Sequence, residues 1–252
     1  MIEAISIHKK FDGKNVLEDI SSTFMQGKTN LIIGQSGAGK TVLLKCIVGL
    51  MSPDKGSIIY DGREISKLNK KEKLSLRREM GMLFQNAALF DSMSVLENVM
   101  FPLDMFSGMT YNERLKRAKF CLERVNLTDA LDKSPDELSG GMQKRAAIAR
   151  AIAMEPKYLF CDEPNSGLDP QTSLIIDELI HGITEEYNIT TIVNTHDMNS
   201  VIGIGDHILY LSGGRLTWEG DKTQVLDSGN EQLDNFLFSS EILRKVKNQS
   251  KR

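Results

Sequence analysis

Hydrophobic and polar positions alternate with a period of two in several short stretches near the start of the chain, a pattern typical of strands. Residues 2–9 alternate in this way, with one face formed by Ile2, Ala4, Ser6 and His8. Residues 57–60 form another such stretch, and the Asp61-Gly62 pair after it is a hairpin turn signal. Residues 30–33 are a mostly apolar run before glycines, which favours a buried strand. The first third of the chain is therefore expected to be rich in strands.

The middle of the chain has helical spacing instead. Residues 63–79 are dense in charge, so we expect a solvated helix there and assign it no function. Helical spacing then dominates residues 86–156. Within this region, the Ala-rich stretch 142–155 follows Ser139-Gly-Gly and stops before Pro156, so the start and stop signals of a helix agree.

Strands and helices alternate again in the last third of the chain. A helix is predicted at 173–187, and strands are predicted at 158–161, 190–195, 207–211 and 216–218. Strand–helix alternation on both sides of a helical insert predicts an α/β fold with a mainly parallel sheet. No stretch has the composition of a linker between independent domains, so residues 1–252 are expected to form a single domain.

Composition and charge exclude several classes of protein. The chain has 252 residues, of which 40% are hydrophobic and 26% charged, values typical of a globular protein and not of a disordered or fibrous one. A net charge of −3 gives no general attraction to nucleic acid, so we expect no nucleic-acid partner. The most apolar stretch, residues 31–51, is interrupted by Lys40 and Lys45, and the first residues lack an export-signal pattern. We therefore expect a cytoplasmic protein without a membrane span.

The three cysteines also indicate a protein of a reducing compartment. Cys46, Cys121 and Cys161 lie far apart in apolar or helical surroundings, without the spacing of a zinc site or a disulfide framework. We expect them to be small core residues in a reducing compartment.

A glycine-rich motif follows the predicted strand at 30–33. The motif fits GxxxxGK[ST], and glycines let successive backbone N–H groups turn toward phosphate oxygens at a helix N-terminus. Lys40 would reach the β- and γ-phosphates of a nucleotide, and the Thr41 hydroxyl would ligate Mg²⁺. The alternative is a glycine-rich turn that binds nothing. The candidate phosphate-binding residues are Gly34, Gln35, Ser36, Gly37, Ala38, Gly39, Lys40 and Thr41.

Two adjacent carboxylates, Asp162 and Glu163, follow the apolar run 158–161. Open α/β sheets bind ligands at the carboxyl ends of their strands. Asp162 suits a Mg²⁺ contact, and Glu163 suits a general base for water. The alternative is that the two charged residues simply end a strand.

A second candidate anion site lies at the start of the Ala-rich helix. The segment Leu138-Ser-Gly-Gly-Met-Gln143 places a serine and two glycines where helix N–H groups can bind an anion. One nucleotide cannot use two such sites unless they face each other. Taken alone, an ordinary helix N-cap is the simpler interpretation.

Together these motifs resemble the full motif set of ABC-type ATPases. The set comprises Gly34–Thr41, Leu138–Gln143 and Asp162-Glu-Pro164, followed by Ser166-Gly-Leu-Asp169 and Thr195-His-Asp197. Their order and spacing match over nearly the whole chain. The resemblance implies a head-to-tail homodimer, in which the serine-glycine segment of one subunit closes over ATP held by the glycine-rich motif of the other. It also implies an ATPase that uses ATP and Mg²⁺.

The same resemblance implies the arrangement of the single ABC ATPase domain. It would be a P-loop NTPase with an N-terminal antiparallel β-subdomain and an inserted helical subdomain. The core would be formed by residues 1–85 and 157–252, the helical insert by 86–156, and a short C-terminal extension by 228–252.

Further roles follow from the resemblance, residue by residue. Phe11 looks like the aromatic residue that stacks on adenine, and Gln85 like the glutamine that touches Mg²⁺ and the attacking water. His196 looks like the histidine that senses the γ-phosphate and orients the general base, and Asp169 like an aspartate at the dimer contact. Ordinary alternatives are a hairpin core residue for Phe11 and a structural histidine for His196. The nucleotide contacts across the dimer would come from Ser139, Gly140, Gly141 and Gln143.

Two positions depart from the family pattern. Asn165 stands where the family usually has a threonine or another small residue, and Asn194 stands where a β-branched residue is common. We expect both to affect rates and not the reaction.

The length and spacing restrict the kind of ABC protein. Two tandem cassettes do not fit within 252 residues. Chromosome and repair proteins need a long coiled-coil insert between Lys40 and Ser139, and that interval has no sustained heptads. A stand-alone ATPase subunit that works with a separate membrane permease is the expected class.

One segment resembles a narrower family. Residues 86–103 are similar, almost word for word, to a segment of the ATPase subunits of MCE-type phospholipid transporters, the Mla (maintenance of lipid asymmetry) family. Residues 135–145 and 162–170 fit the same relatives, and residues 233–237 fit more loosely. The resemblance implies a permease dimer, a STAS-domain protein and a periplasmic MCE-domain protein as partners. It places the chain at the cytoplasmic face of the bacterial inner membrane.

Two surfaces and two alternative functions complete the expectations. Apolar residues around this segment would form a groove for a partner helix or pack inside the helical insert: Phe84, Phe90, Met93, Met100 and Phe101. The basic residues of 244–252 would favour an anionic membrane face or form a solvated terminus. The alternative functions are an ATPase of another transporter, for lipoproteins or amino acids, and a soluble ABC scaffold of iron–sulfur cluster assembly.

Overall fold

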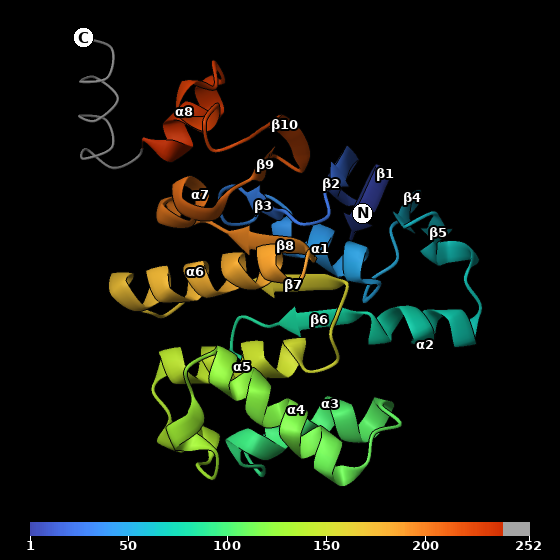
Figure 1. Cartoon of the computed structure of the whole chain (residues 1–252). Helices are drawn as coiled ribbons and strands as arrows, with labels where there is room; N and C mark the ends of the chain where they lie inside the picture. The colour runs from blue at the N-terminus through green and yellow to red at the C-terminus, as the bar shows by residue number, and fades with distance from the viewer. Residues whose placement is uncertain (239–252) are drawn as a thin grey trace. The chain divides into compact units, whose positions relative to one another are not determined.

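The computed structural model describes residues 1–238 (Figure 1). These residues divide into two compact units. Unit 1 comprises residues 1–25 and 29–66 together with the chain from 194 onward. Unit 2 comprises residues 26–28 and 67–193, and so contains the whole predicted helical insert. The basic residues of 244–252 lie outside the described residues, as does the latter part of the predicted extension 228–252.

An antiparallel sheet opens unit 1, in the strand order β2-β1-β4-β5. Its strands are β1 (Ile2–Phe11), β2 (Lys14–Phe24), β4 (Lys55–Tyr60) and β5 (Arg63–Glu64). β1 and β2 are joined through Asp12 and Gly13, both in the left-handed region, which suits the twist of a tight hairpin. The predicted antiparallel β-subdomain is therefore present, and so is the hairpin turn at Asp61-Gly62.

The strict alternation predicted for residues 2–9 is wrong at its centre. Ser6 has a φ of 47°, and the register of β1 against β2 shifts between Ala4 and Ile7. This bulge inserts one extra residue, so Ile7 points into the core in place of Ser6 and His8. The backbone N–H of Ser6 donates instead to Ser21 Oγ at 2.8 Å.

The remaining strands of unit 1 follow the order β10-β9-β3. β3 (Thr29–Ile33) and β9 (His207–Ser212) are parallel, and β10 (Arg215–Gly220) is antiparallel to β9. The unit also contains α1 (Lys40–Val48), α7 (Met198–Ile204), the short turn Val225–Asp227 and α8 (Glu231–Leu237). α8 is held to β9, because the Tyr210 and Phe236 rings stack at 5.5 Å and Tyr210 Oη donates to Gln232 O at 3.1 Å.

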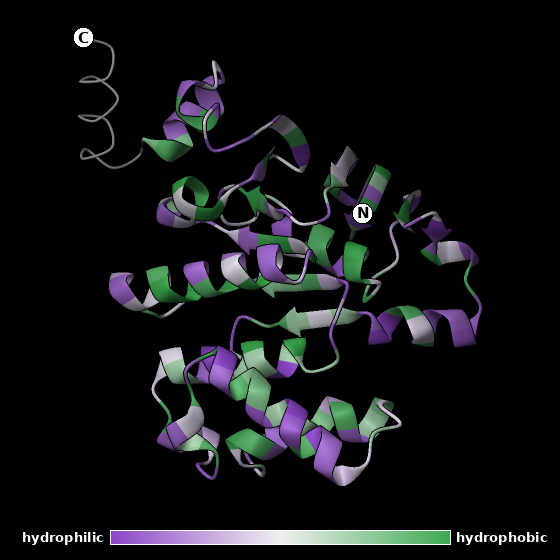
Figure 2. Ribbon diagram, viewed as in Figure 1, coloured by the Kyte–Doolittle hydropathy of each residue, from purple (hydrophilic) through white to green (hydrophobic). Residues whose placement is uncertain are grey.

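Unit 2 has its own run of strands, in the order β8-β7-β6. β6 (Met80–Leu83) and β7 (Tyr158–Asp162) are parallel, and β8 (Thr190–Thr195) begins in this unit. The first four residues of β7 are buried, and Figure 2 shows β6 and β7 as largely hydrophobic ribbons. α6 (Pro170–Glu186) leads from β7 to β8. The parallel and antiparallel pairs, with helices between strands, confirm the predicted α/β class.

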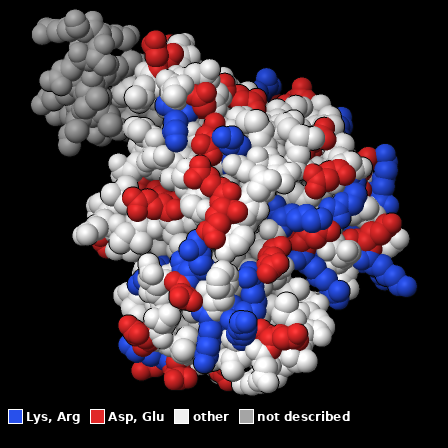
Figure 3. Space-filling view, viewed as in Figure 1, with Lys and Arg blue, Asp and Glu red and all other residues white. Residues whose placement is uncertain are grey.

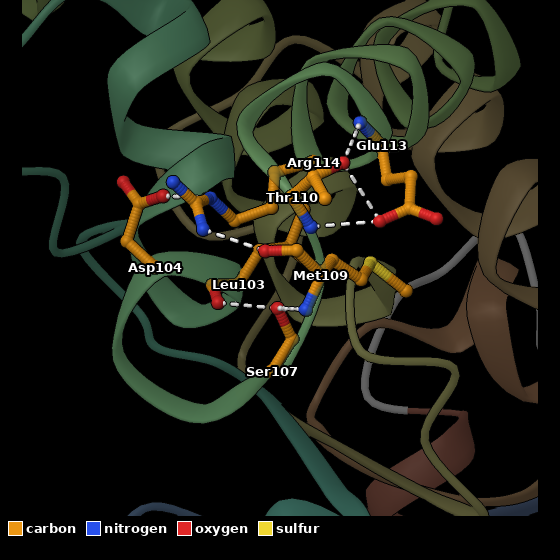
Figure 4. A network of polar contacts seen from close by, with 7 residues as sticks. All are labelled: Leu103, Asp104, Ser107, Met109, Thr110, Glu113 and Arg114. Carbon is orange, nitrogen blue, oxygen red and sulfur yellow. Dashed lines mark hydrogen bonds and ion pairs between the residues drawn. The ribbon is translucent and has the colours of Figure 1, made fainter.

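Three helices of unit 2 pack together: α3 (Val95–Phe106), α4 (Tyr111–Arg124) and α5 (Gly140–Ile152) (Figure 1). Capping boxes built on Ser94 and Thr110 start the first two, and short turns at Thr128–Ala130 and Pro135–Glu137 connect the last two. The corner between α3 and α4 is shown in Figure 4, where Arg114 Nε lies 2.6 Å from Asp104 Oδ1 and Arg114 Nη1 donates to Met109 O at 2.8 Å.

The predicted helix over residues 63–79 is shorter than expected. Residues 63–64 extend the hairpin as β5, a short turn covers Ile65–Lys67, and only α2 (Lys70–Arg78) is an α-helix. The reason is local: Asn69 caps α2 by accepting from Lys71 N at 2.9 Å and Glu72 N at 3.0 Å, so the helix begins there. Figure 3 shows Lys and Arg side chains gathered over α2, as expected for a solvated helix.

The cysteines behave as predicted. Cys46, Cys121 and Cys161 are all buried and none forms a disulfide. Burial raises the pKa of the Cys46 and Cys121 thiols to about 11. Across residues 1–238, none of the helices has the length and apolar character needed to span a bilayer.

Candidate functional site

The glycine-rich motif forms the turn between β3 and α1, as its sequence context predicts. Gly34 has a φ of 150°, and a Cβ there would lie 2.3 Å from Leu211 O. Gly39 has a φ of 99°, and a Cβ there would lie 2.8 Å from Val16 O. Gly37 also has a positive φ, but the space beside it is open. Two glycines therefore allow close packing of the loop, and the third leaves its outer side open.

Lys40 is the first residue of α1, and its side chain curls back over the loop. Its Nζ donates to Gly34 O at 2.9 Å and to Gln35 O at 3.3 Å. The ammonium group is therefore held beside the backbone that would surround a phosphate.

The N-terminus of α1 has the character of an anion site. Its N-cap is Gly39, which offers no side-chain acceptor to the first N–H groups of the helix, and its first turn has no acidic residue. Uncapped N–H groups and the positive end of the helix dipole favour a phosphate. The loop, Lys40 and this helix end fit a nucleoside triphosphate.

Phe11 and His196 are the other predicted site residues of unit 1. Phe11 ends β1 with an exposed ring, and Lys9 Nζ lies 5.7 Å from the centre of that ring. Lys9 is held in turn by Asp54 Oδ1 at 2.7 Å and Ser52 O at 2.9 Å. His196 is exposed between β8 and α7, next to Asp197, which caps α7. Phe11 and His196 are therefore both exposed residues.

Asp162 and Glu163 lie where the sequence predicts them, at the carboxyl end of β7. Both side chains are half-buried. Glu163 has a φ of 49°, in the left-handed region, which costs a residue other than glycine about 1–2 kcal/mol. The Glu163 carbonyl accepts a hydrogen bond from Ser166 N at 3.1 Å. A strained backbone at a proposed general base is a feature typical of functional sites.

Gln85 follows β6 and is exposed. Its Nε2 donates to Ser166 Oγ at 3.3 Å, so its side chain lies beside the turn that follows Glu163. The structure therefore brings two of the predicted catalytic residues, Gln85 and Glu163, to the same region of unit 2.

The serine-glycine segment begins α5. Ser139 is the N-cap and accepts from Met142 N at 3.4 Å. Gly141 packs closely on α6, since a Cβ there would lie 2.5 Å from Thr172 Cγ2, while Gly140 and Ser139 are exposed. Gln143 Nε2 donates to Pro135 O at 2.8 Å, in the turn that precedes α5.

Two further predicted residues have structural partners within unit 2. Asp169 caps α6 by accepting from Thr172 N at 2.9 Å. The hydrogen bond from the Thr172 hydroxyl, together with that from Thr172 N, lowers the pKa of the Asp169 carboxyl. Asn165 is buried, and its Nδ2 donates to Asp177 Oδ1 at 2.9 Å. Asn194 is also buried, at the end of β8.

Three side chains were named as Mg²⁺ ligands: Thr41, Gln85 and Asp162. A hydroxyl, an amide oxygen and a carboxylate are the hard oxygen ligands that Mg²⁺ prefers, together with phosphate oxygens of a nucleotide. In residues 1–238, His, Cys, Asp and Glu side chains do not gather in threes around a possible metal position. The chemistry of these three oxygen donors therefore fits Mg²⁺.

Sequence reasoning missed two cationic side chains of α5 that contact the site segments. Lys144 Nζ donates to the Gln85 carbonyl and, at 3.5 Å, to Glu163 O. Arg150 donates to Ala88 O and Ala87 O, both at 2.8 Å. The sequence around Lys144 and Arg150 does not indicate any burial of their side chains, because charged residues in a helix are usually solvated. Their roles as donors appear only in the structure, where their acceptors are backbone carbonyls of segments distant in the sequence.

Comparison with known proteins agrees with this geometry. The family model described as "ABC transporter" matches residues 17–166. A methionine import ATP-binding protein, MetN of Clostridium acetobutylicum, is 37% identical over 96% of this chain and 75% of its own length. The intermembrane phospholipid transport ATP-binding protein MlaF of Haemophilus influenzae is also 37% identical, over 94% of this chain and 90% of its own length.

A solved structure shares the fold. The ATP-binding cassette MJ0796, in a dimeric post-hydrolysis state bound to ADP and Pi, is similar with a TM-score of 0.80 and 33% identity over 88% of this chain and 99% of its own. The match to the family model covers both the glycine-rich motif and the paired carboxylates. The chain belongs to the ABC transporter family, as an ATP-hydrolysing subunit.

Proposed function

We propose that this chain is the ATPase subunit of an MCE-type phospholipid transporter, at the cytoplasmic face of the bacterial inner membrane. The observation that carries the proposal is the segment 86–103, whose sequence resembles that family. The MlaF relative supports it. Methionine import is a second candidate, because the MetN relative is equally identical.

ATP binding is assigned to residues of both units. In unit 1, Gly34–Thr41 would hold the phosphates through backbone N–H groups and the Lys40 ammonium, and Phe11 would stack on adenine. Thr41, Gln85 and Asp162 would hold Mg²⁺, which neutralises phosphate charge when bound. We propose that the two units form one ABC ATPase domain over residues 1–252, with residues 86–156 as the helical insert.

Hydrolysis is assigned to Glu163 as the general base. A carboxylate at the carboxyl end of β7 can accept the proton of the attacking water, and such help is worth about 10²–10⁴-fold in rate. Gln85 would orient that water, and His196 would sense the γ-phosphate. Glu163 has a left-handed backbone, a strained conformation that is typical of functional sites.

The proposal includes a head-to-tail dimer. Ser139, Gly140, Gly141 and Gln143 of one subunit would contact ATP bound by the other. Ser139 and Gly140 are exposed at the start of α5, which leaves this end of the helix accessible to a second copy.

The membrane permease would dock on the segment after Gln85. Phe84 and Phe90 are exposed there, whereas Met100 is buried in the core of unit 2. The Phe90 ring packs on Phe101 at 4.6 Å, and Arg150 lies 5.8 Å from its centre. The exposed rings support the predicted groove, and the buried methionine supports the alternative of core packing.

Isolation of the chain with its membrane partners tests the proposal. Affinity purification from membranes, followed by mass spectrometry, should recover an integral permease together with STAS-domain and MCE-domain proteins. Recovery of an amino-acid permease would favour methionine import. Recovery of soluble scaffold proteins without a permease would support the iron–sulfur assembly alternative and contradict transport.

A further inference from the structure

Lys144 is a buried lysine in the second turn of α5, with only 4% of its surface exposed. Lysine is almost never buried without partners, because removing an ammonium group from water is costly. Its partners are backbone carbonyls: Nζ donates to Gln85 O and, at the long distance of 3.5 Å, to Glu163 O. The one cation therefore joins the two segments that carry the proposed catalytic residues.

These contacts close a ring around the turn after β7. Lys144 joins Gln85 to Glu163 through their carbonyls. Ser166 N donates to Glu163 O at 3.1 Å, and Gln85 Nε2 donates to Ser166 Oγ at 3.3 Å. The backbone of Gln85 and the turn 163–166 are thus held to each other and to α5.

The ring includes the strained residue. Glu163 is left-handed, and a residue other than glycine keeps this conformation only when its surroundings hold it. Two donors, Ser166 N and Lys144 Nζ, meet its carbonyl. Removing the ammonium group would leave both carbonyls with one donor fewer and would let the turn relax.

The charges around the Lys144 ammonium group are consistent with its place between Gln85 and Glu163. Burial lowers the pKa of Lys144, while Cys161 and the carboxylates of Glu163 and Asp162 oppose that change. Charge-assisted hydrogen bonds to carbonyls are the stronger kind, and they satisfy the buried ammonium group.

We propose that Lys144 is a positioning residue that couples the start of α5 to Gln85 and Glu163. It rests on the proposed function, in which Ser139 contacts the partner's ATP while Glu163 serves the subunit's own ATP. α5 is a rigid element, so a displacement of its capped end moves the Lys144 ammonium group and the two carbonyls bound to it. Closure on one nucleotide would in this way orient the general base for the other.

Arg145 supplies a matched control. It is the next residue of α5, and its Nη1 donates to Val125 O at 3.3 Å and Asn126 O at 2.8 Å. Asn126 is also left-handed, with a φ of 51°. Arg145 therefore makes the same kind of contact, but to the end of α4 and to none of the proposed site residues.

The test compares Lys144→Met, Lys144→Arg and Arg145→Met in the full chain. We expect Lys144→Met to lower kcat about tenfold or more, because small displacements of a catalytic group have effects of this size. ATP affinity should stay within about twofold, because Lys144 is not among the residues proposed to hold ATP. Lys144→Arg should restore most of the wild-type turnover. Arg145→Met should keep turnover within about twofold of wild type, although its loss of Tm should be similar to that of Lys144→Met.

Equal turnover of Lys144→Met and Arg145→Met would overturn the proposal. If Lys144→Met does not fold, Lys144→Gln, which keeps an amide donor, is measured in the same way and judged by the same comparison. Glu163→Gln is included because it separates the two claims. If Glu163→Gln keeps wild-type turnover, the assignment of the general base in the proposed function is wrong. If Lys144→Met keeps wild-type turnover while Glu163→Gln loses it, only the positioning role of Lys144 is wrong.

Discussion

Single residues of the phosphate loop carry different physical demands. Gly34 needs both a positive φ and the absence of a Cβ, because the Leu211 carbonyl occupies that position. Gly37 needs only the positive φ, since nothing lies beside it. Gly34 is a fixed position of the GxxxxGK[ST] motif and Gly37 is one of its variable positions, and the sequence does not reveal the steric demand at either.

Gly34→Ala and Gly37→Ala should therefore differ in stability. We expect Gly34→Ala to lower the free energy of unfolding by about 2 kcal/mol or more, because backbone must shift to relieve the clash. Gly37→Ala should cost only about 1 kcal/mol, the price of a left-handed alanine. Urea unfolding of both variants measures the difference, and equal losses would contradict this account of the loop.

The contact between His207 and Glu219 in unit 1 makes a pH-dependent contribution to the stability of the fold. His207 lies between Asn30 Oδ1, at 3.0 Å from Nδ1, and Glu219 Oε1, at 2.8 Å from Nε2. Hydrogen bonding to His207 is the main cause that lowers the pKa of the Glu219 carboxyl, and a hydrogen bond from Ser22 adds to it. The contacts of His207 are therefore with residues of β3 and β10.

Protonation of Glu219 at acidic pH should consequently lower the stability of the fold. Because its folded pKa lies below the ordinary value, the contribution is present at neutral pH and is lost as the pH falls through the folded pKa. Glu219→Gln should remove this acid dependence and flatten the plot of Tm against pH below about pH 5. If the variant and wild type lose Tm in parallel between pH 5 and pH 3, the assignment is wrong.

Among secondary-structure elements, α3 organises the segment that precedes it. Asn98 is fully buried in α3 and binds the backbone of that segment. Its Oδ1 accepts from Phe90 N at 2.8 Å, and its Nδ2 donates to Phe90 O and Met93 O, both at 3.1 Å, and to Ser94 O at 3.0 Å. One amide thus satisfies the polar groups of a turn that has no regular structure of its own.

Asn98→Ala should loosen that turn. We expect a loss of about 2–3 kcal/mol, since buried backbone groups lose their partners. Hydrogen exchange of residues 86–94 should accelerate more than that of β6 or α4. The control Ser94→Ala removes the cap of α3, should cost about 1 kcal/mol and should leave the exchange of Phe90 unchanged. Uniform acceleration across unit 2 in Asn98→Ala would contradict a local role.

Element prediction from the sequence succeeded where local patterns decide. The strand before the glycine-rich motif, the Ala-rich α5 and β7 all lie where hydrophobic period and caps place them. It failed where one residue breaks the period, as Ser6 does in β1. Burial of Lys144 was also unforeseen, because that depends on carbonyls far away in the sequence.

At the scale of the whole molecule, exposed aromatic rings are candidates for contacts with a partner protein. Phe90 and Phe120 are both exposed phenylalanines, each with an arginine near its ring: Arg150 at 5.8 Å and Arg117 at 5.2 Å. Phe90 lies in the proposed permease groove, whereas Phe120 lies on α4 outside it. The two rings therefore form a matched pair for testing the groove.

Phe90→Glu should weaken assembly with the permease, because a carboxylate would be desolvated in an apolar contact. Phe120→Glu should leave assembly unchanged. Co-purification of the permease with each variant, together with ATP turnover of the isolated chain, measures assembly and folding separately. A folded Phe90→Glu variant that still recovers the permease at the wild-type level would exclude this groove as the docking site.

The head-to-tail dimer around ATP is the central claim, and disulfide crosslinking between two different copies tests it most directly. In a Glu163→Gln background, one copy carries Ser36→Cys and the other Ser139→Cys, while the native cysteines stay in place because all three are buried. The account predicts a crosslinked pair of unlike copies when ATP is saturating and little of it without nucleotide. Absence of that pair, with ATP shown to be bound, would contradict the shared site.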